Sequence, residues 1–465
     1  MSIIFYHVFL WLYRTGIRLI APWNRKARLW LAGRKDIFRK IRTEMGAAQE
    51  ARAKQGSMGD VVWIHCSSLG EFEQGRPVLE RIRQQAPGCR IVLTFFSPSG
   101  YETKKDYAGA DHIFYLPLDS RRNARQFIDL VKPTLVLWVK YDYWYYYLVE
   151  LKRQHIPVLL ISGIFRPDQP FFRWYGKLHR YMLECFSHLF VQTERSKALL
   201  GRLGFAEVAS VSGDTRFDRV IEIAEAGEPL PLIEAFCGQQ AVIVAGSTWE
   251  EDEEEVDHYA NRHPELRFII APHEIGEDRL REVERLFRHS IRYSAWQRER
   301  AGSGGKPGTE GSGRESRAAQ GIGKGSRAAG AGGGGKVTGW PDPNVLIIDN
   351  IGMLSRLYKY ATIAYVGGGF GDDGVHNVLE AAVYGKPVVY GPVIEKYIEA
   401  VELTESGGGI VIDSALEAER VFNRLLQNPG EYREAGEASR NYVHSKKGAT
   451  ALILTYIQEK RLLTS

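Results

Sequence analysis

Cysteine is scarce in this sequence, and its residues stand far apart. Cys66, Cys89, Cys185 and Cys237 form no CxxC pair, so neither a zinc knuckle nor a disulfide framework is indicated. This spacing favours a reducing, cytoplasmic compartment. An excess of one charge sign is also lacking, because 61 basic and 56 acidic residues leave a net charge of only +5. The small surplus fits an anionic substrate or membrane surface and gives no indication of nucleic acid binding.

An uninterrupted apolar run of the roughly 20 residues that span a bilayer is absent. Residues 3–13 (IIFYHVFLWLY) are apolar and aromatic, but Arg14 and Arg18 follow, and Trp, Leu and Ile then alternate with Arg and Lys as far as residue 35. This mixture is typical of a helix that lies in the membrane interface and faces anionic lipid. An uncleaved signal sequence or an ordinary core helix is the alternative reading, although no small-residue cleavage site follows. We expect residues 1–45 to be a membrane-associated helical segment, monotopic or peripheral.

The length of 465 residues is more than one core usually organises, and 44% hydrophobic with 25% charged residues is the composition of a globular protein. Short β-branched runs alternate with helical patterns from residue 61 onward, and a second such series begins near residue 240. This rhythm predicts an α/β protein with two Rossmann-like domains that face a cleft. The boundaries that we predict are an N-terminal domain at 50–220, a linker at 221–239, a C-terminal domain at 240–445 and a C-terminal helix at 446–465.

Residues 301–339 contain almost nothing large enough to build a core, since Gly, Ser, Ala and scattered Arg dominate them. We interpret this stretch as a flexible insertion in the second domain. A basic tether to phosphate or lipid is the alternative. No repeat of the solenoid type is visible.

In the first half, polar residues follow predicted strands, where ligands of parallel sheets bind. In HCSSLGEFEQGRP (65–77), Glu71 stands at a helix start, where a carboxylate can accept a proton or simply be stabilised by the helix dipole. Lys140 and Asp142 stand within an aromatic cluster, VKYDYWYYYL. Arg216, in SVSGDTRFDRV, offers a planar cation to a phosphate, or a salt bridge to Asp214 or Asp218.

In the second half, VAGSTWEEDEEE places small residues and hydroxyls before a helix, which is a natural phosphate site. Pro272 and His273 directly follow a predicted strand. In residues 365–392, glycines allow tight turns beside a ligand, and Asn377 and Glu380 share one face of a helix start.

In this order, HCSSLGE, TFFSPSGYE, GSTWEEDE and HNVLEAA resemble the 3-deoxy-D-manno-octulosonic acid (Kdo) transferases of Gram-negative lipopolysaccharide synthesis, which have the GT-B fold. The resemblance extends from the N-terminus to about residue 455, without the Gly-rich insertion. It implies a glycosyltransferase that moves Kdo from CMP-Kdo to a lipid A precursor at the cytoplasmic face of the cell inner membrane. Because no DxD pair ends a strand, we expect metal-independent transfer with no cofactor beyond the donor substrate.

The resemblance also assigns residues. It makes Glu71 the catalytic base, and it places Lys140 where the family has Glu and Arg216 where it has Lys. Either Lys140 stabilises the leaving phosphate or Asp142 takes the acidic role. The expected CMP-contacting residues are Pro272 and His273 (Pro-Arg in the family), Ile351, Gly352, Met353 (Glu in the family), Asn377, Val378, Leu379 and Glu380. The alternatives are a GT-B enzyme for a UDP- or GDP-sugar, and an inactive membrane scaffold.

Overall fold

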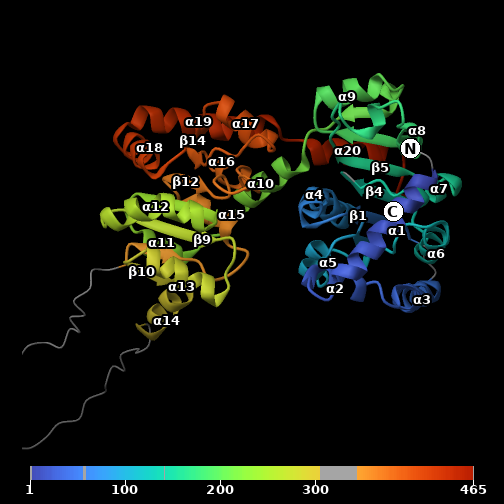
Figure 1. The fold of residues 1–465 in the computed structure, drawn as a ribbon, viewed down its shortest axis with the longest axis horizontal. Helices are drawn as coiled ribbons and strands as arrows, with labels where there is room; N and C mark the ends of the chain where they lie inside the picture. Colours follow the sequence, from blue (N-terminus) through green and yellow to red (C-terminus); the bar gives the residue numbers. More distant parts are fainter. Residues whose placement is uncertain (1–2, 56–58, 141, 304–342, 464–465) are drawn as a thin grey trace, which may run out of the picture. The chain divides into compact units, whose positions relative to one another are not determined.

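The computed structural model describes residues 3–55, 59–140, 142–303 and 343–463. The insertion predicted at 301–339 lies outside the described residues from 304 onward. The chain forms two compact units: residues 1–225 with 443–465 make the first unit, and residues 226–442 make the second (Figure 1). The residues predicted as a linker, 221–239, contain the end of one helix, four connecting residues and a second helix.

A seven-stranded parallel sheet forms the centre of the first unit, in the order β3-β2-β1-β4-β5-β6-β7. Its strands are β1 (Val61–Cys66), β2 (Arg90–Phe95), β3 (His112–Tyr115), β4 (Leu135–Val139), β5 (Val158–Gly163), β6 (His188–Val191) and β7 (Ala209–Val211). The residues of β2 and β4 are buried throughout, because helices cover both faces of the sheet. The first five strands were predicted; β6 and β7 were not.

The helices of the first unit include three at the N-terminus and one from the C-terminus. They are α1 (Ile3–Ile20), α2 (Arg25–Ala32), α3 (Ile37–Gln55), α4 (Leu69–Gln85), α5 (Pro98–Lys104), α6 (Arg121–Val131), α7 (Tyr145–Arg153), α8 (Lys177–Leu183), α9 (Glu194–Gly201), α10 (Thr215–Ala226) and α20 (Ala449–Glu459), with 3-10 turns η1 (Pro170–Phe172) and η2 (Ala206–Val208).

The second unit repeats this architecture with a parallel sheet in the order β10-β11-β9-β8-β12-β13-β14. Its strands are β8 (Val242–Thr248), β9 (Arg267–Pro272), β10 (Ser290–Arg292), β11 (Val345–Ile347), β12 (Ile363–Val366), β13 (Val388–Tyr390) and β14 (Gly409–Val411). Its helices are α11 (Pro231–Cys237), α12 (Glu250–Arg262), α13 (Glu277–Leu286), α14 (Tyr293–Ser303), α15 (Leu354–Leu357), α16 (Leu379–Ala382), α17 (Ile398–Glu405), α18 (Ala415–Gln427) and α19 (Pro429–Ser445), with η3 (Tyr358–Tyr360). The α/β class with two Rossmann-like sheets is thereby confirmed.

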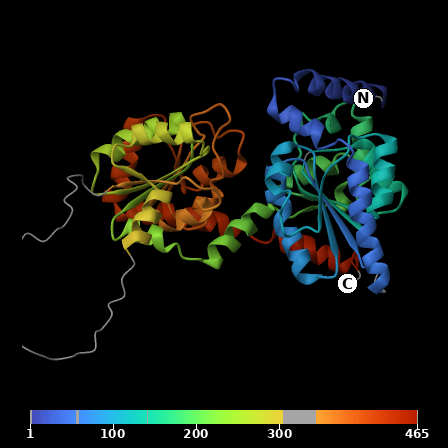
Figure 2. The ribbon, with the colours of Figure 1, turned by 90° about the horizontal axis from the view of Figure 1, so that it is seen from below.

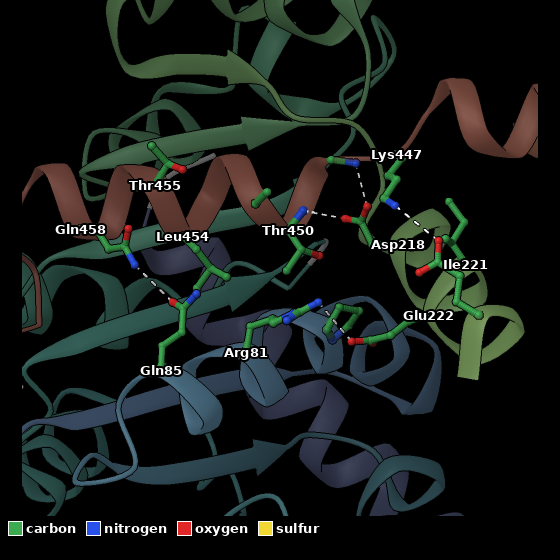
Figure 3. A pocket seen from close by; sticks show the side chains of 14 residues that line it. Arg81, Gln85, Asp218, Ile221, Glu222, Lys447, Thr450, Leu454, Thr455 and Gln458 are labelled. Carbon is green, nitrogen blue, oxygen red and sulfur yellow. Dashed lines mark hydrogen bonds and ion pairs between the residues drawn. The ribbon is translucent and has the colours of Figure 1, made fainter. Parts of the chain in front are cut away.

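The C-terminal helix α20 returns to the first unit, where it packs on α4 (Figure 3). The Asp218 carboxylate accepts hydrogen bonds from the backbone N–H groups of Gly448 (2.7 Å) and Thr450 (2.6 Å). These are the N–H groups that a helix start leaves without intrahelical partners. Asp218 therefore joins α10 to the start of α20.

The N-terminal helix α1 lies against segments that follow the strands of the first sheet, at the end of the unit marked N in Figure 2. The Tyr6 hydroxyl donates a 2.5 Å hydrogen bond to Asp119, which follows β3, and the Tyr13 ring packs on Phe96, which follows β2. Helix α1 thus covers the carboxyl edge of the sheet. Among the described residues it is the one helix that is long and apolar enough to cross a membrane by length and composition alone.

Candidate functional site

The strand order of the first sheet reverses between β1 and β4, and crevices at such a switch point bind ligands in doubly wound sheets. Glu71 follows β1 at this point. Helix α4 begins directly after Ser68, whose backbone N–H donates to Glu71 Oε2 at 3.1 Å, and the Ser68 hydroxyl donates to the same oxygen. The capping box satisfies backbone groups of the helix start. Oε1 of Glu71 accepts no hydrogen bond from the residues that the structure describes, so this oxygen can receive a proton.

Asp142 follows β4 and lies close to Glu71. The Ser67 hydroxyl donates to its carboxylate, and the Trp138 indole N–H donates to its backbone carbonyl. Burial raises the pKa of the Asp142 carboxyl to about 6; the Ser67 hydrogen bond opposes this rise, while the negative charge of Glu71 adds to it. The switch point therefore holds two neighbouring carboxyl groups, one of which titrates near neutral pH.

Arg216 forms a salt bridge with Asp214, which is one of the two partners that the sequence offered. Its guanidinium donates two hydrogen bonds to Asp214 Oδ2, at 3.0 and 2.8 Å. Gln74 and Gln192 donate to the same oxygen at 2.9 and 3.1 Å. Burial acts to raise the pKa of Asp214, but Arg216 and the nearby Lys140 outweigh it, so the pKa lies below its ordinary value. Lys140 and Arg216 are thus brought together around one buried carboxylate.

Three residues at strand ends have left-handed backbone conformations that side chains other than glycine rarely adopt. Lys140 has φ 62°, Ser162 at the end of β5 has φ 53°, and Ser247 in β8 has φ 54°. Such conformations cost about 1–3 kcal/mol and cluster at functional sites. They occur here at the carboxyl edges of both sheets.

An apolar pocket of about 660 Å³ extends from Asp142 along α1. Its lining is Phe5, Tyr6, Val8, Phe9, Leu12, Asp142, Tyr143, Trp144, Gln169, Pro170, Phe171, His179 and Met182. On α1 the side chains of Phe5, Phe9 and Leu12 are 66%, 51% and 56% exposed. The pocket thus joins a carboxylate to an exposed apolar surface, which suits an amphiphilic ligand.

The carboxyl edge of the second sheet carries glycines for steric reasons. A Cβ at Gly367 would stand 2.5 Å from the Ser247 carbonyl oxygen, and Gly368 has φ 90°. The buried Asp252 carboxylate accepts the backbone N–H of Gly368 at 2.7 Å and the Tyr365 hydroxyl at 2.9 Å. The loop between β12 and α16 is therefore fixed close to the end of β8, which is the switch point of this sheet.

His273 lies over a pair of hydrogen-bonded rings at the same edge. The Trp249 indole N–H donates to His376 Nε2 at 3.0 Å, and the two rings are nearly parallel. The His273 ring stacks on each of them, with centroids 4.6 Å from Trp249 and 4.5 Å from His376. Burial, with His273 as a further cause, lowers the pKa of His376 to about 4, so this imidazole is neutral at pH 7.

In the HNVLE segment, two polar side chains are partly exposed and two apolar side chains are buried. The Asn377 amide donates to Glu380 Oε1 at 3.0 Å, and both side chains are partly exposed. Val378 and Leu379 are fully buried, so their contacts with a ligand are limited to the backbone. Asn377 Oδ1 is buried without a hydrogen-bond partner among the described residues, which leaves an acceptor for a ligand donor.

The remaining predicted donor-site residues lie at the ends of β9 and β11. Pro272 is the last residue of β9 and is buried, whereas His273 beside it is exposed. In the loop after β11, Ile351 is 87% exposed, Gly352 has φ 99° and Met353 is buried before α15. All of the predicted donor residues therefore follow strands of one sheet edge.

Several residues of these two edges were not assigned from the sequence. In the first unit, Ser67 donates to Asp142, and Gln74 and Gln192 donate to Asp214, the partner of Arg216. In the second, the rings of Trp249 and His376 stack on His273. Ser67 carried a signal, since it directly follows β1 in HCSSLGE. Gln192 carried none, because the strand before it, β6, was not predicted.

Three comparisons relate this chain to known proteins. Residues 39–219 match the family described as 3-Deoxy-D-manno-octulosonic-acid transferase (kdotransferase). A 3-deoxy-D-manno-octulosonic acid transferase of Chlamydophila psittaci is 26% identical over 408 residues, which cover 84% of this chain and 83% of that protein. A bifunctional glycosyltransferase/methyltransferase of Fusobacterium nucleatum is 24% identical over 87% of this chain, but the match spans only 56% of that protein.

Among solved structures, the UDP-GlcNAc 2-epimerase from Neisseria meningitidis bound to UDP-GlcNAc superposes with a TM-score of 0.56 at 16% identity, covering 86% of this chain and all of that one. This likeness concerns the fold, and it agrees with the predicted GT-B-like pair of sheets. The shared sequence makes the chain similar to Kdo transferases over most of its length, and Kdo transferases are glycosyltransferases.

Proposed function

We propose that this protein transfers Kdo from CMP-Kdo to a hydroxyl group of a lipid A precursor. In this reaction the acceptor oxygen forms a bond to the anomeric carbon, and the bond from that carbon to the CMP phosphate oxygen breaks. The acceptor proton passes to Glu71, and CMP leaves with the electron pair. Glu71 suits the role of base because one of its oxygens is held by Ser68 while the other accepts no hydrogen bond from the described residues.

The observation that carries this proposal is the apolar pocket that ends at Asp142. A lipid A precursor has sugar hydroxyls at one end and acyl chains at the other. The pocket offers the Asp142 carboxyl group at one end and the exposed side chains of α1 along its wall. An acyl chain on α1 would bring a sugar hydroxyl toward Glu71, which lies beside Asp142.

Asp142 assists the base in this proposal. When Asp142 is ionised, its negative charge stabilises the positive charge that develops on the acceptor hydroxyl as it attacks the anomeric carbon. Of the two readings of this region, we favour Asp142 in the acidic role. Lys140 lies instead beside Asp214 and Arg216, where both cations serve to stabilise phosphate charge.

The donor nucleotide is proposed to bind at the carboxyl edge of the second sheet. The glycines after β12 permit close approach of a ligand. The exposed imidazole of His273 stacks on the rings of Trp249 and His376 beside them. Asn377 offers its buried carbonyl oxygen to an exocyclic amino group, as on cytosine. No metal and no cofactor are part of the proposed reaction.

The proposed location is the cytoplasmic face of the inner membrane, with α1 in the interface. Tyr6 and Leu10 hold α1 on the first unit, while Ile4, Phe5, Trp11 and Leu12 are each more than half exposed. A helix with one face on the protein and an apolar face outward binds a membrane surface.

A direct test is to incubate the protein with a lipid A precursor and a CMP-Kdo generating system, and to count the added sugars by mass spectrometry. UDP- and GDP-sugars serve as competing donors in parallel reactions. Transfer of Kdo that Glu71→Gln slows by about 10²–10⁴ supports the proposal. Transfer from a UDP- or GDP-sugar instead, or no transfer at all, would favour the other GT-B enzyme or the inactive scaffold.

A further inference from the structure

A second cavity in the first unit, of about 560 Å³, carries an excess of positive charge and shares no lining residue with the pocket at Asp142. It lies among the second half of α1, the turn between α2 and α3, and the loop before α6. Its cationic lining residues are Arg14, Arg18, Arg34, Lys35 and Arg39, against a single carboxylate, that of Asp36.

The one carboxylate neutralises little of this charge. Asp36 pairs with Arg39 at 3.4 Å, and both side chains are more than half exposed, so the pair is weak. The side chains of Arg14, Arg18 and Lys35 make no hydrogen bond or ion pair with any residue that the structure describes. Their charges are therefore available to a ligand.

Arg34 holds a fixed charge at the back of the cavity. Its guanidinium donates to three backbone carbonyls, those of Leu116 (3.0 Å), Trp30 (3.2 Å) and Phe96 (2.7 Å), and it stacks 4.0 Å from the Trp30 ring centroid. Burial lowers the pKa of Arg34 to about 9, which still leaves it charged at neutral pH. A buried cation without a carboxylate partner favours an anion nearby.

The start of α6 adds to the positive electrostatic potential of this cavity. Ser120 and Asn123 line the cavity, and the Ser120 hydroxyl accepts the Asn123 backbone N–H at 3.2 Å as the N-cap of this 11-residue helix. A helix N-terminus carries partial positive charge that stabilises phosphates. It adds to the four cations that Asp36 does not pair.

The surroundings on α1 indicate which anion has access. Arg14 and Arg18 stand between exposed apolar side chains of the same helix, with Trp11 before them at 65% exposure and Leu19 after them at 66%. On an interfacial helix, cations in such positions lie at the depth of lipid headgroups. We infer that this cavity binds the phosphate headgroup of an anionic phospholipid. The inference rests on the proposed membrane location and not on the proposed reaction.

The test uses the full-length chain and vesicles of two compositions, phosphatidylcholine alone and phosphatidylcholine with phosphatidylglycerol. Arg14→Gln/Arg18→Gln removes two cavity charges, and Arg25→Gln/Lys26→Gln removes two exposed charges of α2 that do not line the cavity. Because a charge-assisted hydrogen bond is lost at each site, the cavity variant should bind phosphatidylglycerol vesicles about tenfold or more weakly than the control variant. Both should bind phosphatidylcholine vesicles alike.

Equal losses in the two double variants would overturn the inference, since they would mean diffuse attraction to the surface. A raised acceptor KM of the cavity variant in phospholipid-free detergent, with unchanged vesicle binding, would also overturn it, because the cavity would then hold a phosphate of the acceptor. Lys35→Gln gives a second, single-site measurement if the double variant melts at a lower temperature. Selective vesicle binding by a protein that transfers no sugar would sustain this inference while rejecting the proposed function.

Discussion

The Trp249 indole N–H donates a 3.0 Å hydrogen bond to Nε2 of His376, although the two residues are 127 positions apart in the sequence. Because Nε2 accepts, the proton of the neutral imidazole is on Nδ1. The pair links the end of β8 to the loop after β12, and His273 stacks on both rings. The orientation of His273 therefore depends on a hydrogen bond in which it takes no part.

We predict that Trp249→Phe raises the donor KM about fivefold with little change in kcat. Phenylalanine keeps an aromatic ring but loses the hydrogen bond, a loss of about 1 kcal/mol. Trp296→Phe is the matched control, because it removes a 3.2 Å hydrogen bond from an indole to the Leu232 carbonyl in the same unit, outside the proposed donor site. Steady-state kinetics with varied CMP-Kdo measures the effect. Equal KM values for the two variants would contradict a positioning role for Trp249.

Asp214→Asn should lower the free energy of unfolding by about 3 kcal/mol, because it removes the negative charge that Arg216 pairs with at the buried Asp214 side chain. The pKa of Asp214 is lowered in the folded protein, so its stabilising effect is complete above the unfolded value near 3.8 and is lost as pH falls through the lower folded value. Between pH 5 and 8 the difference between wild type and variant should therefore be constant.

Urea unfolding at several pH values measures this difference. Asp106→Asn is the control, since Asp106 is exposed and has no ion pair among the described residues. A difference that grows or shrinks between pH 5 and 8 would assign the titration to another group.

The sheets could be predicted from the sequence where strands are long and apolar. VVWIHC and TLVLWV have the unbroken apolar character of strands buried on both faces, and each became a central strand. Of the missed strands, β6 has four residues, all buried. The other two, β7 and β10, have three residues each, and only one of those six residues is buried. At the edge of a sheet, a short strand forms because it pairs with its neighbour, and the local sequence pattern does not indicate that pairing.

The candidate site could be predicted only in part, for a similar reason. Glu71 stands in a local helix-start pattern, so its position after β1 could be read directly. The closeness of Asp142 to Glu71, and of Lys140 to Asp214, depends on which strands are neighbours. From the sequence, either Asp214 or Asp218 could be the salt-bridge partner of Arg216. In the structure Asp214 pairs with Arg216, whereas Asp218 accepts a hydrogen bond at the start of α20.

The apolar face of α1 should determine membrane binding. We expect Trp11→Ser/Leu19→Ser to weaken binding to vesicles at least about tenfold, since each side chain loses a favourable transfer into the interface. Both are exposed and line neither cavity, so the melting temperature should not change. Leu416→Ser/Leu452→Ser, two exposed leucines of other helices, is the control in flotation assays. Deletion of residues 3–35 is a poorer test, because Trp30 is buried in the first unit.

The roles of the two carboxyl groups at the switch point can be separated by pH. Glu71→Gln keeps the shape of the proposed base but removes its basicity, so turnover should fall by about 10²–10⁴ at every pH while CMP binding is unchanged. Asp142 has a pKa raised to about 6, so it loses its charge as pH falls through that value. Wild-type turnover should fall with it, because a neutral Asp142 no longer stabilises the positive charge that develops on the attacking acceptor hydroxyl.

Asp142→Asn should therefore have lower turnover than wild type at pH 8 and should lack the fall near pH 6. The measurement is kcat between pH 5 and 9 for wild type, Asp142→Asn and the Asp106→Asn control. If Asp142→Asn keeps the fall near pH 6, another group titrates there. If Glu71→Gln transfers Kdo at the wild-type rate while Asp142→Asn is inactive at every pH, the base is Asp142 itself, and its raised pKa then places it within the range in which a general base operates at neutral pH.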